Sequence, residues 1–129
     1  MIKTAFQVAA RNYLIPVFKL PHLEDSLIEK TIGCRKFKAY VDTIEKAPEN
    51  IKVERFEIIS VELFSTNNVG FVNMRAITTE DGKPLPSYVF LRGGAVTVLL
   101  LVNGKMLLVR QYRVPLQRYG LEAPAGMLD

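Results

Sequence analysis

The spacing of apolar residues changes at Pro48, and this change constrains the fold more than any other feature of the chain. In residues 23–46 apolar side chains recur three or four positions apart, as they do on one face of a helix. Gly33 lies inside this segment, and glycine within a helix costs about 1 kcal/mol relative to alanine. The sequence therefore predicts two short helices that separate near Gly33 and end before Pro48. The apolar positions are Leu27, Ile28, Ile32, Phe37, Tyr40, Val41 and Ile44.

From residue 51 onward the sequence is typical of β-structure. Residues 53–63 and 69–78 are rich in β-branched and aromatic side chains, and Asn67-Asn68 between them predicts a hairpin. Asp81-Gly82 predicts a second turn, and a strand is expected at 88–91. Short helices followed by many strands predict an α+β fold.

The most apolar stretch of the chain is residues 95–102, which show no alternation of polar and apolar positions. Such a run predicts a strand that is covered on both faces. Asn103-Gly104 is a strong signal for a type I′ hairpin turn, so residues 105–113 are predicted to return as the paired strand. Eight residues are far fewer than the roughly 20 that cross a bilayer, so no membrane partner is expected.

Composition indicates a globular chain: 49% of the 129 residues are apolar and 23% are charged. The net charge is +4, and its densest cluster, Arg35-Lys36 with Lys38, is interpreted as a solvated helix face. Nucleic-acid binding is the minority interpretation, because no aromatic residues interleave with this cluster to provide a stacking surface. No nucleic-acid partner is expected.

The single cysteine and the single histidine exclude several kinds of site. Cys34 can form neither an intrachain disulfide nor a cysteine-based metal centre, which fits a reducing compartment. His22 lies in a proline-flanked turn, and no nucleophile motif is present, so a catalytic role for it is not predicted. Gly93-Gly94 lacks the spacing of a phosphate-binding loop and predicts either a tight turn or close backbone packing.

Residues 1–22 are basic and contain no acid, a composition shared with organellar transit peptides. Pro16 and Pro21 interrupt any long amphipathic helix there, which favours a short helix followed by an ordered strand. A cytoplasmic location is predicted, and organellar targeting is left open.

Two arginines stand near the end of the second predicted hairpin. On a strand Arg110 and Tyr112 would share one face, and Gln111 and Arg113 would share the other. A loop then leads to the segment at 121–129, Leu-Glu-Ala-Pro-Ala-Gly-Met-Leu-Asp. A diphosphate needs divalent cations on its oxygens and a planar guanidinium for the remaining charge. A strand, a loop and a glycine turn in this order can bring an arginine beside a loop that binds a metal ion.

Three segments together resemble the Nudix hydrolases, especially the ADP-ribose and plant-type ADP-sugar diphosphatases. They are a V-F-x-R-G-x-A-V strand at 89–96, a Q-x-R-x-P strand end at 111–115, and the E-x-P-A-G-M-L-D sequence at 122–129. The resemblance implies an N-terminal β-rich subdomain that contributes to a homodimer, followed by the first part of a Nudix α/β/α sandwich. It also implies hydrolysis of a nucleoside diphosphate sugar, ADP-ribose or ADP-glucose, to AMP and a sugar phosphate with Mg²⁺ or Mn²⁺.

The resemblance also assigns roles to four residues. Arg113 matches the arginine that contacts the diphosphate, and Ala125 matches the residue whose backbone carbonyl is a metal ligand. Gly126 matches the first glycine of the Nudix box, G-x5-E-x7-R-E-U-x-E-E-x-G-U. Glu122 either orients a metal-bound water or braces the loop, and it is assigned to substrate binding with Arg113.

The first glutamate of that box would fall three positions beyond Asp129. No catalytic residue is therefore expected within this chain, which should not hydrolyse ADP-sugars by itself and should self-associate or pair with another polypeptide. The expected organisation is an N-terminal strand and helical segment at 1–50, a β-meander dimerisation subdomain at 51–92, and the start of the Nudix domain at 93–129. The alternative function is that of a non-catalytic, Nudix-derived dimerisation or scaffold subunit.

Overall fold

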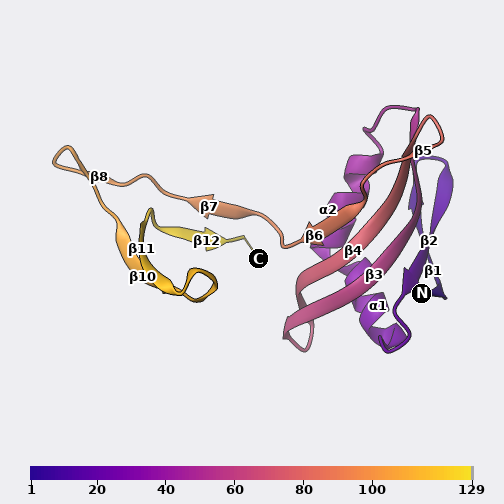
Figure 1. Ribbon diagram of the computed structural model, residues 1–129, viewed down its shortest axis with the longest axis horizontal. Helices are drawn as coiled ribbons and strands as arrows, with labels where there is room; N and C mark the ends of the chain where they lie inside the picture. The colour runs from indigo at the N-terminus through magenta and orange to yellow at the C-terminus, as the bar shows by residue number, and fades with distance from the viewer. Residues whose placement is uncertain (129) are drawn as a thin grey trace. The chain divides into compact units, whose positions relative to one another are not determined.

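The computed structural model describes residues 1–128, and the chain divides into two compact units, Met1–Arg92 and the residues from Gly93 onward (Figure 1). Within the described residues both α-helices belong to the first unit, whereas strands occur in both units. This arrangement confirms the predicted α+β class. No helix of the described part is long and apolar enough to cross a membrane.

The first unit is built on a mixed sheet whose strands follow the order β1-β2-β3-β4-β5, with β6 also paired to β4. Strands β2 and β3 are parallel, and the other neighbours are antiparallel. The long β3–β4 ladder confirms the hairpin predicted from the two β-branched runs, with its turn at Thr66 and Asn67. The strands are β1 (Ile2–Ala10), β2 (Tyr13–Lys19), β3 (Ile51–Ser65), β4 (Asn68–Glu80), β5 (Lys83–Pro84) and β6 (Tyr88–Leu91).

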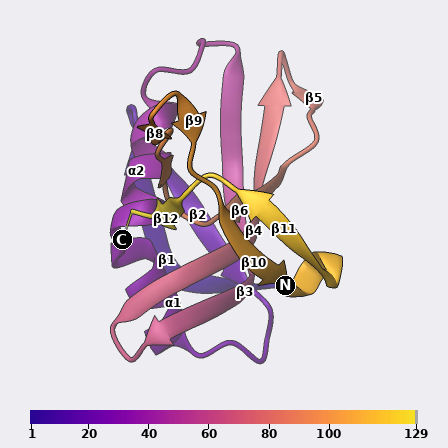
Figure 2. The ribbon, with the colours of Figure 1, turned by 90° about the vertical axis from the view of Figure 1, so that its left-hand side faces the viewer.

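Two helices, α1 (Asp25–Gly33) and α2 (Arg35–Ile44), connect β2 to β3 and lie along one side of β3 and β4 (Figures 1 and 2). They separate at Cys34, whose backbone is extended, as the position of Gly33 predicts. The apolar stripe of α2 packs on the sheet, where the Phe37 ring meets the Phe56 ring edge-on at 5.2 Å between centroids. Both rings are fully buried, so this contact lies at the centre of the core.

The expectation of a short helix at the start of the chain is wrong. Residues 2–19 form the β1–β2 hairpin instead, with a turn at Arg11 and Asn12. Along β1 the exposure of side chains alternates from Thr4 to Ala10, which is the signature of a strand with one buried face. The alternation of exposed and half-buried side chains along this segment therefore fits a strand and not a helix.

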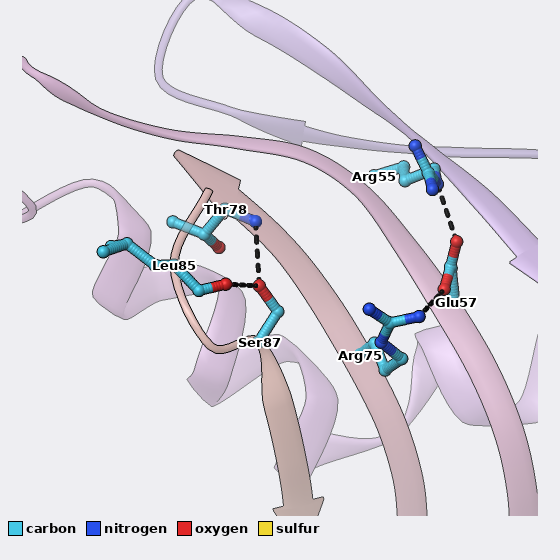
Figure 3. Close-up of polar contacts among 6 residues, drawn as sticks. All are labelled: Arg55, Glu57, Arg75, Thr78, Leu85 and Ser87. Carbon is cyan, nitrogen blue, oxygen red and sulfur yellow. Dashed lines mark hydrogen bonds and ion pairs between the residues drawn. The ribbon is translucent and has the colours of Figure 1, made fainter. Parts of the chain in front are cut away.

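The sheet face turned away from the core carries a buried carboxylate. Glu57 lies between Phe56 and Ile58, which point into the core, so its side chain points to the other face. It accepts hydrogen bonds from Arg55 Nε (2.7 Å) and Arg75 Nη1 (3.3 Å), and the two guanidinium groups compensate its charge (Figure 3). The same figure shows Ser87, whose hydroxyl donates to the Leu85 carbonyl and accepts from the Thr78 N–H, which fixes the segment between β5 and β6.

The second unit consists of three two-stranded ladders, β7–β12, β8–β9 and β10–β11, among the described residues. A single 3₁₀ turn, η1 (Val114–Leu116), connects β10 to β11. The strands are β7 (Ala95–Thr97), β8 (Leu101–Val102), β9 (Lys105–Met106), β10 (Val109–Arg113), β11 (Arg118–Glu122) and β12 (Ala125–Met127). Gly93, at the start of the unit, has a φ of +83°, a backbone conformation that glycine adopts readily.

The predicted strand over 95–102 and its predicted partner over 105–113 are only partly correct. The turn at Asn103 and Gly104 is present, with φ values of +50° and +75°. However, β7 ends at Thr97 and pairs with β12, and β10 pairs with β11 rather than with residues 95–102. The side chains of 95–102 are exposed instead of covered on both faces. An apolar run indicates that burial of these side chains is favourable. It does not indicate which other element packs over them.

Candidate functional site

The candidate site is built on the β10–β11 hairpin. Its register places Arg113 opposite Arg118, Gln111 opposite Gly120 and Val109 opposite Glu122. Because directly opposed residues lie on the same face of a ladder, Arg113 and Glu122 project from one face of the hairpin. The sequence predicted this face for Arg113 but did not predict that Glu122 would share it.

Arg113 and Glu122 form a two-pronged ion pair. The Nε–H of Arg113 donates to Glu122 Oε2 at 2.6 Å, and Nη2 donates to Oε1. Such side-on pairing of a guanidinium with a carboxylate fixes both the position and the plane of the group. The structure therefore joins the two residues that the sequence assigned to substrate binding.

The ion pair shifts the pKa of both groups. Hydrogen bonds from Arg113 lower the pKa of the Glu122 carboxyl, and the hydrogen bond to Glu122 raises the pKa of the Arg113 guanidinium. Both shifts favour the charged forms, so the pair is intact at neutral pH. Both side chains contact solvent, and exposed pairs contribute little to stability. The main effect of the pair is therefore to orient the guanidinium.

The other face of the hairpin carries a stack of side chains. The guanidinium of Arg110 lies 3.8 Å from the centre of the Tyr119 ring, and this ring meets Tyr112 edge-on. The Tyr112 hydroxyl donates to the Gln117 side-chain carbonyl at 3.0 Å, beside the 3₁₀ turn. These contacts confirm that Arg110 and Tyr112 share a face, and they hold the hairpin together from the side opposite to Arg113.

Ala125 and Gly126 lie on β12, which pairs with β7. The Val98 N–H donates to the Pro124 carbonyl at 2.8 Å, and the Leu128 N–H donates to the Gly94 carbonyl at 2.9 Å. In an antiparallel ladder hydrogen-bonded residues alternate, so the carbonyl of Ala125 points to the opposite edge of β12, away from β7. This orientation leaves the Ala125 carbonyl outside the β7 ladder, as a metal ligand would require.

A divalent cation such as Mg²⁺ or Mn²⁺ needs several oxygen ligands. Within the described residues no three His, Cys, Asp or Glu side chains gather closely enough to hold a metal ion. The Glu122 carboxylate is hydrogen-bonded to Arg113. Of the residues that the sequence assigned to this site, Ala125 therefore offers an oxygen, its backbone carbonyl, that could bind the cation. These residues provide part of a site and do not form a complete one.

Part of the chain is similar in sequence to a protein named as a Nudix hydrolase. The chain is 36% identical over 89 residues to Nudix hydrolase 14, chloroplastic, of Arabidopsis thaliana. The match covers 64% of this chain but 28% of the relative, so the chain spans less than a third of the length of that protein. No protein-family model matches the chain, and no solved structure matches it.

Sequence reasoning missed one residue of this site, Gly120. An added Cβ at this position would lie 3.3 Å from Glu122 Oε2, so the carboxylate rests over the space that the missing side chain leaves. The φ of Gly120 is not in the left-handed region, so its backbone does not require glycine. Only the register, which places Gly120 between Arg113 and Glu122, reveals its role.

Proposed function

We propose that this chain is part of a Nudix hydrolase that cleaves the diphosphate of ADP-ribose or ADP-glucose to give AMP and a sugar phosphate. The observation that carries the proposal is the oriented guanidinium of Arg113, which the Glu122 carboxylate holds in position. Glu122 ends the hairpin and lies two residues before the Pro124-Ala125-Gly126 segment. The similarity to a protein named Nudix hydrolase 14 supports the reaction class. The choice of ADP-sugars rests on the resemblance of the motifs at 111–115 and 122–129.

In this function Arg113 binds an oxygen of the diphosphate, and the Ala125 carbonyl provides one ligand to Mg²⁺ or Mn²⁺. When bound, the metal neutralises the charge of the diphosphate and activates water. Gly126 begins the Nudix box. Residues 1–129 alone are expected to be inactive, because a carbonyl and an arginine cannot hold the metal ions. We further propose that residues 51–92 form a dimerisation subdomain.

The test is AMP release from ADP-ribose and ADP-glucose by the full-length protein with Mn²⁺. Arg113→Ala should lower kcat/KM by roughly 100-fold, since a charge-assisted, bidentate contact to phosphate is lost. Arg110→Ala removes the same charge from the opposite face of the hairpin and should have a much smaller effect. Equal losses in the two variants would show that charge alone matters and would contradict the role of Arg113.

A non-catalytic dimerisation or scaffold subunit is the alternative function. It is favoured by exposed apolar side chains in the second unit, including Leu99 (67%), Leu101 (63%) and Leu121 (69%). Sedimentation of the full-length protein would reveal its association in either case. A stable assembly that releases no nucleoside monophosphate from any nucleoside diphosphate sugar would support the scaffold and exclude the hydrolase.

A further inference from the structure

The Arg113–Glu122 pair leaves one edge of the guanidinium outside its contacts. The carboxylate is bonded to Nε and Nη2, which form the side edge of the planar group. The end edge, formed by Nη1 and the second proton of Nη2, points away from Glu122, because the five N–H bonds of a guanidinium have a fixed geometry. A second anion can therefore bind at the end edge while Glu122 stays in place.

Glu122 reaches Arg113 only by lying lengthwise along the hairpin. It is opposite Val109, four residues from Arg113, which corresponds to about 13 Å of strand. The pair between them on this face is Gln111 and Gly120. Because Gly120 has no side chain, the carboxylate can lie above it, 3.3 Å from where a Cβ would be. A Cβ at position 120 would be in tight contact with the carboxylate, and a branched side chain there would crowd it further.

We propose that Glu122 is a positioning residue that turns the end edge of Arg113 toward the diphosphate, and that Gly120 provides the space it needs. This inference rests on the proposed function, in which Arg113 binds the diphosphate. It assigns Glu122 a role that acts through Arg113, rather than through a metal-bound water or the loop.

Charge and orientation predict opposite effects for the loss of Glu122. A carboxylate close to the diphosphate repels it, so Coulomb's law alone predicts tighter anion binding after Glu122→Gln. If Glu122 instead holds the guanidinium in position, the same substitution frees the Arg113 side chain and weakens binding. Glutamine keeps the length and shape of the side chain, so the sign of the effect separates the two explanations.

The experiment measures the binding of inorganic pyrophosphate and of ADP-ribose, and the kcat and KM for ADP-ribose, in the full-length protein with Mn²⁺. Glu122→Gln should weaken the binding of both ligands by roughly tenfold, which is typical for the loss of one charge-assisted orienting contact. Gly120→Val should have a similar effect, although valine favours strands and preserves the hairpin. Leu121→Val, on the opposite face, is the matched control and should bind both ligands normally.

A double-mutant cycle shows whether Glu122 acts through Arg113. Lysine lacks the two parallel N–H donors of the side-on contact with the carboxylate, so Glu122→Gln should have no further effect in an Arg113→Lys background. An undiminished effect in that background would overturn the inference, as would unchanged or tighter binding in the single variant. If the wild-type protein binds neither ligand, the proposed function fails and this inference fails with it. Normal binding in the wild type and in Glu122→Gln overturns the inference alone.

Discussion

The two units of this chain contain similar proportions of apolar residues but differ in what those residues contact. In the first unit the buried apolar side chains, from Ala10 to Ala76, form one cluster between the helices and the sheet. In the second unit residues 95–102 are more continuously apolar, yet all of them are exposed. The difference lies in the second layer: α1 and α2 cover the sheet of the first unit. An apolar strand becomes a core strand only when another element packs on it.

Hydrogen exchange should show the largest difference between the units. Amides within the β3–β4 ladder are expected to exchange only through openings of about 5 kcal/mol or more. The amides of Leu99, Leu100 and Leu108 lie outside strands, and they should exchange with almost no protection. Mass spectrometry of the exchanging chain measures both segments in one experiment. Comparable protection in the two segments would show that a partner covers the second unit, so that both units have buried strands.

Truncation of one apolar side chain in each unit tests the same comparison. Phe56→Ala should destabilise the first unit by about 3–5 kcal/mol, because the ring is fully buried against Phe37 and Tyr40. Leu99→Ala removes a side chain that is 67% exposed and should change the stability by less than about 0.5 kcal/mol. Urea unfolding followed by circular dichroism measures both values. A large loss in the leucine variant would reveal contacts that bury Leu99 in solution.

The smallest expected effect concerns acid. Because the pKa of Glu122 is lowered in the folded chain, the ion pair with Arg113 is present above the ordinary glutamate pKa of about 4.3 and is lost as the pH falls through the lowered value. NMR titration of the Glu122 carboxyl should therefore give a midpoint below that in an Arg113→Ala variant. The stability of the chain should hardly change, because the pair is exposed. Identical midpoints in the two proteins would show that the pair does not form in solution.

Local signals predicted most of the first unit. The structure confirms the two helices, the break between them near Gly33 and the β3–β4 hairpin. Each of these predictions depended only on residues that are neighbours in the sequence. The helix expected at the start of the chain was wrong because a proline-containing segment can join the sheet as a strand. The parallel partnership of β2 with β3 could not be predicted, because it joins residues far apart in the sequence.

The sequence proposed the individual residues of the candidate site, but it did not predict the contact between Arg113 and Glu122. Motif resemblance selected Arg113 and Glu122, and the structure brings their side chains together. The contact depends on the hairpin register and on the 3₁₀ turn that sets it, and neither is readable from the motif. Gly120 shows the same limit, since a glycine that makes room for a neighbour has no sequence signature of its own.

The parallel joining of β2 to β3 sets an order of assembly for the first unit. Strand β3 acquires β4 through a tight turn, but it acquires β2 only after residues 20–50 have folded back across the sheet. Closing that longer loop costs more chain entropy. During synthesis β1 and β2 leave the ribosome before β3, so the open edge of β2 is paired only after β3 has emerged. These two strands are thus synthesised before β3 but join the sheet after the β3–β4 hairpin.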